Sequence, residues 1–350
     1  MIMRKCFIRV AAAVILTVVL TALLNRIFSP KYITENLDGR ITGEFYTQAK
    51  DPDVIFLGAS TVHYCISPDQ LWHLFGFTSY DRSNASQTMW QSYYMLTDTL
   101  RFTKPSLVVL DVSFIKNGEE FVEEPSNRKV IDDMRDPVSK LGAVRSSAGD
   151  FEQPLSYFIP VLRYHSRWKE LTWQDVKYAF VRPNVTYDGY LMDFTIPSEQ
   201  HIYEPEPVDE VVFPQKSTEY LEKIIELCQK RQIPLLLMKT PTFVNSWHKE
   251  YDEKLSVLAA EKGLNYVNFS DAAEEMGIRV RTDYIDDGEH MNTVGAHKFC
   301  EYLGKYLTEN YDILFEKDEE TVRAWDMKYR AYEEAYNKGI EEYGEGTKSR

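Results

Sequence analysis

Short apolar, β-forming runs alternate with amphipathic helical patterns in two parts of the chain, and this alternation constrains the fold most. The first part contains "DVIFLG", "FTSYDRS" and "SLVVLDVSF", and the second contains "IPLLLMKTP" and "LNYVNFSD". Strands separated by helices pair in parallel, because the crossover helix returns the chain to the same end of the sheet. We therefore predict an α/β fold, a three-layer α/β/α sandwich around a mostly parallel sheet.

Capping residues indicate where several helices begin and end. In "SPDQLWHLFG", Ser67 is the expected N-cap, Pro68 the first helical residue and Gly76 the stop. Gly263 closes a second helical pattern, and Thr293 is the expected N-cap of the last core helix.

The strand–helix rhythm stops between about residues 115 and 214, where Pro, Asp, Glu and aromatic residues are frequent. We interpret this stretch as an insertion or lid within a single domain of residues 32–350. A structural cap without substrate contact is the alternative. A charged C-terminal helix is expected at about residues 316–345.

The N-terminus carries a basic and then apolar segment. Arg4, Lys5 and Arg9 precede an uncharged stretch from Val10 to Leu24. We predict that residues 1–31 form a cytoplasmic tip and an uncleaved transmembrane helix, and a cleaved secretory signal is the alternative. Because Lys and Arg before a span favour a cytoplasmic N-terminus, the main domain is expected outside the cell membrane.

Charge and cysteine content exclude several classes of function. The formal net charge of −14 argues against binding to nucleic acid, whose phosphates would be repelled. Cys6, Cys65, Cys228 and Cys300 show no paired spacing, so we expect neither a disulfide framework nor a zinc site.

Two distant motifs carry the candidate chemistry. Ser60 directly follows the first predicted strand, at the end of a parallel sheet where ligands bind. A serine nucleophile needs a base, and "DYIDDGEHMNTVGAHKF" supplies His290 with Asp287 three residues before it. The Asp287 carboxylate would fix one imidazole nitrogen while the other takes the serine proton. Asp283 and Asp286 are alternatives to Asp287.

Other reactive side chains near these motifs are weaker candidates. His63 and His297 are expected to pack or to form hydrogen bonds, and Cys65 has no basic neighbour to activate its thiol. The acidic residues around His290 are also metal-ligand types, but no second ligand cluster accompanies them. We therefore expect no metal site and no cofactor.

The motifs "FLGAS" and "DGEHMNTVGAHKF" resemble the first and last blocks of the SGNH (GDSL-like) hydrolase superfamily. This resemblance implies a flavodoxin-like three-layer fold and a catalytic triad of Ser60, Asp287 and His290. It covers residues 51–114 and 216–311 in outline and does not include the insertion.

This sequence departs from the superfamily's pattern in the second and third of its motif blocks. Ser83 or Asn84 in "DRSNASQ" is the nearest counterpart of the second-block glycine, and "VVLDVSF" offers Asp111 and Ser113 in place of the third-block asparagine. The resemblance implies an oxyanion hole built from the backbone N–H groups of Ser60 and of Ser83 or Asn84.

A serine triad supports transfer of an acyl group to water or to another hydroxyl. A single anchor before such a domain resembles membrane-attached members in Gram-positive bacteria, including the D-alanyl transfer protein of teichoic acid synthesis. Such proteins commonly work beside a membrane-bound O-acyltransferase. The resemblance implies acylation or deacylation of a cell-surface glycan or teichoic-acid-like polymer, with an O-acyltransferase as partner. A non-catalytic glycan-binding surface protein and a secreted small-ester or lipid esterase are the alternatives.

Overall fold

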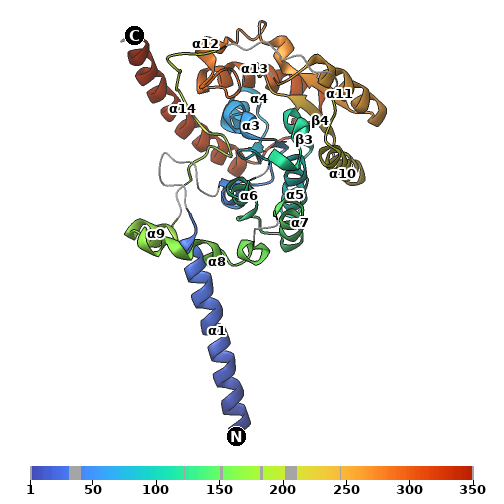
Figure 1. The fold of residues 1–350 in the computed structure, drawn as a ribbon. Coiled ribbons are helices and arrows are strands. Elements are labelled where there is room, and N and C mark those ends of the chain that lie inside the picture. The colour runs from blue at the N-terminus through green and yellow to red at the C-terminus, as the bar shows by residue number, and fades with distance from the viewer. Residues whose placement is uncertain are drawn as a thin grey trace.

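A five-stranded parallel sheet forms the centre of the molecule (Figure 1). The computed structural model describes residues 2–30, 41–121, 123–149, 153–181, 184–201, 211–244 and 246–348. The strands are β1 (Val54–Leu57), β2 (Ser79–Asp81), β3 (Leu107–Asp111), β4 (Leu235–Lys239) and β5 (Asn265–Asn268). Their order, β2-β1-β3-β4-β5, is that of flavodoxin-like doubly wound sheets and confirms the predicted fold class.

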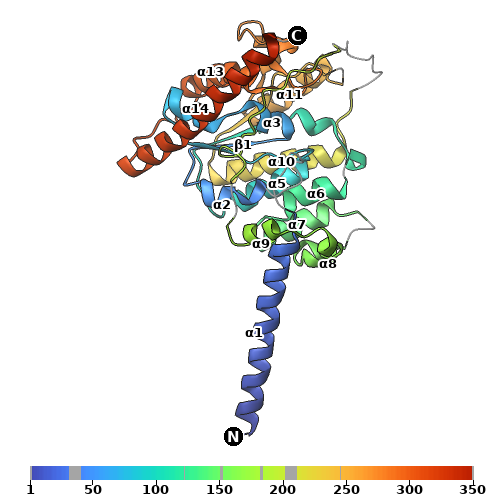
Figure 2. The same cartoon turned by 90° about the vertical axis from the view of Figure 1, so that its left-hand side faces the viewer.

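Helices cover both faces of this sheet, as Figure 2 shows from the side. Alternate strand residues point to opposite faces, so Ile55 and Leu57 join one core cluster while Val54 and Phe56 join the other. The first cluster includes residues of α5 (Met89–Thr99), α10 (Gln215–Arg231) and α11 (Lys249–Lys262). The second includes residues of α3 (Ser60–Cys65), α4 (Pro68–Phe75) and α13 (Thr293–Asn310).

The helix ends confirm one set of capping predictions and correct another. Ser67 caps α4, and Gly76 ends it in the left-handed conformation at φ +77°. The N-cap of α13 is Asn292 and not Thr293, because the Asn292 side chain accepts hydrogen bonds from two N–H groups of the first turn. The Thr293 hydroxyl is engaged by Tyr190 instead.

The segment predicted as an insertion has three structural parts. Helices α6 (Glu124–Ile131) and α7 (Pro137–Ser147) pack against α5 and contribute to the first core cluster. Residues 154–181 lie beside the end of α1 in both views and contain η4 (Pro154–Tyr157), α8 (Val161–Tyr164), η5 (His165–Lys169) and α9 (Trp173–Tyr178). In residues 187–201, Gln200 and His201 form hydrogen bonds to the loop that carries His290.

Shorter elements and one long C-terminal helix complete the chain. The short ones are η1 (Ile41–Gly43), α2 (Phe45–Gln48), η2 (Ser113–Lys116), η3 (Glu119–Phe121), η6 (Phe269–Ala272) and α12 (Val280–Asp283). The C-terminal helix is α14 (Glu319–Lys348), which packs on α4 through Trp325 against Trp72 and Tyr329 against His73.

The N-terminal helix α1 (Ile2–Phe28) projects away from the body (Figure 1). Its segment Met3–Phe28 is long and apolar enough to cross a membrane, and its most apolar part is not buried by the rest of the chain. A membrane anchor and a signal sequence both have these properties. The predicted boundary between anchor and domain, at residues 31 and 32, lies outside the described residues.

The turn that leaves β1 has no space for a side chain at Gly58. A Cβ atom there would lie 2.4 Å from Val62 Cγ2 and 2.9 Å from Asp111 Cβ. Because both neighbours belong to the core, we expect Gly58→Ala to lower the free energy of unfolding by about 1–3 kcal/mol. Chemical denaturation of the purified full chain measures this change.

Gly118→Ala is the matched control for that substitution. A Cβ at Gly118 would meet only the flexible carboxylate end of Glu120, which can move aside. We expect its free energy of unfolding to stay close to that of the wild type. Equal stability of the Gly58 variant and the wild type would contradict the close approach around β1.

Candidate active site

Ser60 is the first residue of α3, at the carboxyl end of β1. Gly58 and Ala59 form the turn between the strand and the helix, and Ala59 occupies the N-cap position without a side-chain cap. The N–H groups of a first helical turn have no carbonyl partner within the helix. The Ser60 hydroxyl and its own N–H group are therefore presented at the edge of the sheet where parallel strands end.

Ser60 meets His290 at this edge. The Ser60 Oγ and His290 Nε2 atoms lie 2.7 Å apart, although the two residues are 230 positions apart in the sequence. The other ring nitrogen of His290, Nδ1, lies 2.5 Å from Asp286 Oδ2. These contacts form a chain from hydroxyl to imidazole to carboxylate, the arrangement of a serine nucleophile with its base and orienting acid.

The carboxylate in this chain is Asp286, whereas the sequence pattern favoured Asp287. The Asp287 carboxylate instead accepts a hydrogen bond of 2.8 Å from the backbone N–H of His201, and it contacts no nitrogen of His290 in the described structure. Asp283, the other alternative, is buried and pairs with Lys298 at 2.7 Å. The structure thus brings Ser60 and His290 together as predicted. The carboxylate that contacts the His290 ring is that of Asp286, one residue before Asp287.

The shape of the loop explains why Asp286, and not Asp287, contacts the His290 ring. Asp286 Oδ1 accepts backbone hydrogen bonds from Gly288, Glu289 and His290 at 2.8–3.1 Å, so the chain wraps around this one carboxylate. The wrap requires φ +104° at Gly288, a value that favours glycine. It turns the next side chain, that of Asp287, away from the ring.

The same contacts keep the Asp286 carboxyl ionised. Burial alone would raise its pKa, but hydrogen bonds from the His290 side chain and backbone lower the pKa below its usual value. An ionised Asp286 fixes the proton on Nδ1 of His290 and leaves Nε2 to accept a proton from Ser60.

Two neighbouring residues that the sequence analysis missed hold this loop. The Tyr64 ring meets the His290 ring edge to face, with centroids 5.4 Å apart. The Gln200 side chain donates to the backbone oxygens of Val280 and Asp286, both at 3.0 Å. Tyr64 could have been found, because it lies four residues after Ser60 and therefore on the same face of a helix.

Of the two backbone N–H groups predicted as second oxyanion donors, that of Ser83 is engaged elsewhere. The backbone N–H of Ser83 donates to Asp81 Oδ1 at 2.8 Å, and the Asn84 side-chain amide donates to the Thr42 hydroxyl at 3.0 Å. The Ser83 N–H is therefore held by Asp81, whereas the Asn84 bond uses its side chain and leaves the prediction for its backbone N–H as it stood. Of the predicted donors, the Ser60 N–H is the one placed by the turn itself.

Asp111 supports the nucleophile turn. Its carboxylate accepts hydrogen bonds from the Thr61 hydroxyl at 2.8 Å and from the Ser113 hydroxyl at 2.5 Å. Asp111 is buried at the end of β3, and Thr61 directly follows Ser60. Asp111 therefore fixes the first turn of α3.

The remaining histidine and cysteine candidates are placed as packing residues. His63 is buried beside His290, and burial lowers the pKa of His63 to about 3, so its ring stays neutral. His297 stacks near Tyr336. Cys65, Cys228 and Cys300 are buried free thiols, as expected, and burial raises the pKa of Cys65 well above its usual value.

Asp286, Glu289 and His290 also form a compact group of metal-ligand types, with one candidate atom of each lying within 4.8 Å of the others. The atoms that a metal would use on Asp286 and His290 already share a hydrogen bond. A metal at this point would have to break the contact that orients the imidazole.

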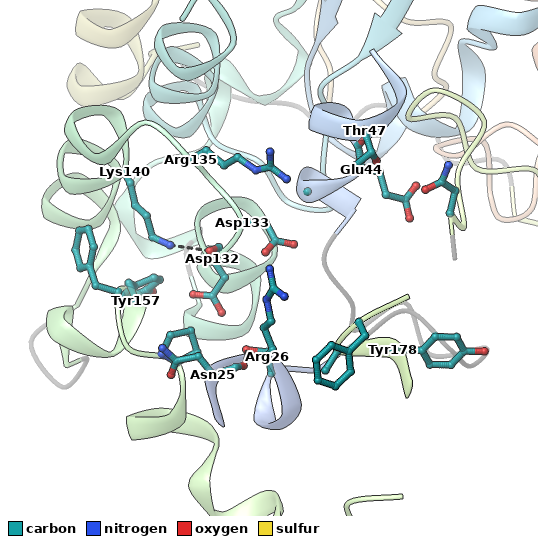
Figure 3. Close-up of a pocket in the computed structure, with 17 residues that line it drawn as sticks. Asn25, Arg26, Glu44, Thr47, Asp132, Asp133, Arg135, Lys140, Tyr157 and Tyr178 are labelled. Atoms are coloured by element: carbon teal, nitrogen blue, oxygen red, sulfur yellow. Dashed lines mark hydrogen bonds between the residues drawn. The ribbon is translucent and has the colours of Figure 1, made fainter. Parts of the chain in front are cut away.

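A cavity of about 530 Å³ lies away from these residues, near the end of α1 (Figure 3). Its lining includes Arg26, Glu44, Asp133 and Arg135, and neither Ser60 nor any other member of the hydroxyl–imidazole–carboxylate chain contributes to it. The cavity therefore does not belong to the candidate active site.

No protein-family model and no curated protein matches this chain. Among solved structures, a "putative acylhydrolase" from Bacteroides fragilis NCTC 9343 matches at 11% identity with a TM-score of 0.39, over 80% of this chain and 99% of its own. A "putative platelet activating factor" from Streptococcus pneumonia matches at 13% identity with a TM-score of 0.39, over 76% and 91%. At such scores the fold assignment depends on the strand order and register described above.

The buried Asp81 carboxylate accepts the hydrogen bond from the Ser83 N–H, and we expect it to make the free energy of unfolding depend on pH. Burial raises the pKa of its carboxyl to about 8, against the opposing hydrogen bonds from Ser83. The protonated acid is thus favoured in the folded state, and its contribution to stability is lost as the pH rises from about 4 towards 8. The free energy of unfolding of the wild type should fall over this range relative to Asp81→Asn, by at most about 1.4 kcal/mol per pH unit. Parallel stability curves for the two proteins would show that Asp81 is ionised in the fold.

Proposed function

We propose that this protein is a serine-dependent acyl-transfer enzyme, an esterase or O-acyltransferase of the SGNH type. The observation that carries the proposal is the hydrogen-bonded chain Ser60–His290–Asp286, formed by the first residue of α3 and the loop before α13. Nucleophile, base and orienting carboxylate each have the partner that their role requires.

In the proposed reaction, Ser60 Oγ attacks the carbonyl carbon of an ester while His290 Nε2 takes the hydroxyl proton. The imidazolium that forms is stabilised by Asp286 on the other nitrogen. Collapse of the tetrahedral intermediate breaks the ester bond, and His290 gives its proton to the departing alkoxide. Water or a second hydroxyl then attacks the acyl-enzyme while His290 takes its proton. Collapse of this second intermediate breaks the bond between the acyl group and Ser60 Oγ, His290 returns the proton to Oγ, and the acid or the new ester leaves.

The oxyanion of the intermediate needs donors aimed at its developing charge. The backbone N–H of Ser60 supplies the first in this proposal. A second donor from the backbone N–H of Ser83 would require a change of partner, away from Asp81, and the backbone N–H of Asn84 is the other proposed donor.

We further propose that α1 anchors the chain in the cell membrane, with the catalytic domain outside the cytoplasm. The substrate class that suits this placement is a cell-surface glycan or teichoic-acid-like polymer carrying ester-linked acyl groups. A membrane-bound O-acyltransferase is the proposed partner, because it would supply or share the acyl group at the same surface. This part rests on the resemblance to membrane-attached members of the superfamily.

Active-site labelling tests the proposal with a pair of neighbouring substitutions. A fluorophosphonate probe should label the wild type, and Ser60→Ala should abolish labelling. Asp286→Asn should slow it by about 10²–10⁴-fold, because the imidazole loses its orienting charge. Asp287→Asn, the matched control one residue away, should label at nearly the wild-type rate. Equal effects of the two asparagine variants would contradict the assignment of Asp286.

The alternatives give different outcomes in the same assays. A folded wild-type protein that no probe labels at any pH, yet which retains glycan, would indicate the non-catalytic surface protein. With an ester substrate, product partition toward an added glycan hydroxyl indicates a transferase, and release to water alone indicates an esterase. Turnover confined to small or lipid esters would favour the third alternative.

A further inference from the structure

Residues 154–181, here called the collar, expose an unusual density of large hydrophobic side chains. Outside α1, 17 such residues are exposed in the described part of the chain, and seven of them lie in this segment. They are Leu155, Phe158, Leu162, Trp168, Trp173, Phe180 and Val181. The four other tryptophans of the protein are buried, whereas Trp168 is 65% exposed and Trp173 is 80% exposed. A water-facing surface gives no reason to concentrate exposed aromatic residues in one short segment.

The collar lies beside the end of α1, where the apolar helix meets the body (Figures 1 and 2). Helices α8, η5 and α9 all contact α1. The backbone N–H of Val161 donates to Asn25 Oδ1 at 2.9 Å, and the Arg167 guanidinium donates to the backbone oxygen of Phe28 at 2.6 Å. These bonds fix the collar at the level where the apolar stretch of α1 ends.

The charge of the collar is opposite to that of the whole protein. It contains four Lys or Arg residues and two Asp or Glu residues, within a chain whose net charge is −14. Arg26, on α1 itself, points towards the cavity above the collar, whose lining also includes Glu44, Asp132 and Asp133 (Figure 3). Basic residues mixed with tryptophan are typical of segments that lie in the headgroup region of a bilayer with anionic lipids.

We propose that the collar docks on the outer surface of the bilayer, with Trp168, Trp173 and Phe180 inserted at the headgroup boundary. Its occupant is the lipid surface itself, continuous with the membrane around α1. This inference rests on the proposed anchoring by α1 and is independent of the chemistry at Ser60. Docking attaches the domain at two places, so that it fixes the orientation and height of the catalytic edge above the membrane.

Depth-dependent quenching tests this contact in the intact protein. The full chain is placed in two kinds of phosphatidylcholine–phosphatidylglycerol nanodisc. In one kind the lipids carry bromine atoms on the acyl chains close to the headgroup, and in the other the lipids carry no bromine. Brominated lipid should quench the tryptophan fluorescence of the wild type, because the two exposed tryptophans lie in contact with lipid. The Trp168→Phe/Trp173→Phe double variant should lose most of this quenching, although phenylalanine keeps an aromatic side chain at both positions.

Trp325→Phe is the matched control, because Trp325 of α14 is buried against Trp72 of α4. It should leave the bromine-dependent quenching at the wild-type level. Wild-type fluorescence that is equal in brominated and plain lipid, or quenching that persists in the double variant, would overturn docking of the collar.

Alkaline carbonate extraction of membranes separates the possible failures. Protein that stays in the membrane pellet but shows no bromine quenching is anchored without a docked collar. Protein released by carbonate has no anchor, and the collar proposal fails with it. Fluorophosphonate labelling of Ser60 reports on the proposed activity in either case.

Discussion

The hydrogen bond between Ser60 and His290 depends on a fold that brings residues 230 positions apart to one edge of a sheet. Parallel pairing of β1 with β2 and β3 places all their carboxyl ends on the same side. The turn after β1 carries Ser60 and the loop after β2 carries Ser83 and Asn84, whereas Asp286 and His290 lie in the loop between α12 and α13. A different strand order would separate the hydroxyl from its base, so the sheet topology is the condition for the proposed chemistry.

Buried polar contacts hold these loops in place below the reacting atoms. Asp111 binds the hydroxyl next to Ser60, and the buried ion pair of Arg82 with Asp98 at 3.1 Å fixes the loop after β2 to α5. Arg82 also donates to the backbone oxygen of Thr42 at 2.8 Å. Removing one partner of such a buried pair typically costs about 3–5 kcal/mol, because the other charge is left without compensation. These buried contacts therefore support the turn that carries Ser60 and the loop after β2.

The amino-acid sequence predicts the sheet, most of the helices and the meeting of Ser60 with His290, because strand-ending turns and capping patterns are local signals. It does not distinguish Asp286 from Asp287. Either aspartate can reach a histidine three or four residues later, and the choice depends on three backbone hydrogen bonds that form only in the folded loop. Asn292 replaced Thr293 as a helix cap for a similar reason, since both are good capping residues.

The segment of residues 115–214 was the least predictable part, because its apolar residues follow no single helical or strand spacing. Its apolar residues serve two environments: those of α6 and α7 enter the core beside α5, whereas those of the collar remain exposed next to α1. Composition alone cannot separate a core-facing from a membrane-facing aromatic residue. Their placement relative to α1 supports the proposed distinction, and it links the proposed anchor to the orientation of the proposed active site.

A crystal structure of the protein after reaction with an organophosphonate would test the central claim most directly. The account predicts a covalent bond from Ser60 Oγ to phosphorus, with His290 Nε2 within hydrogen-bond reach and Asp286 on Nδ1. An unmodified Ser60 lying more than about 6 Å from the imidazole, beyond even loose unliganded geometry, would contradict it.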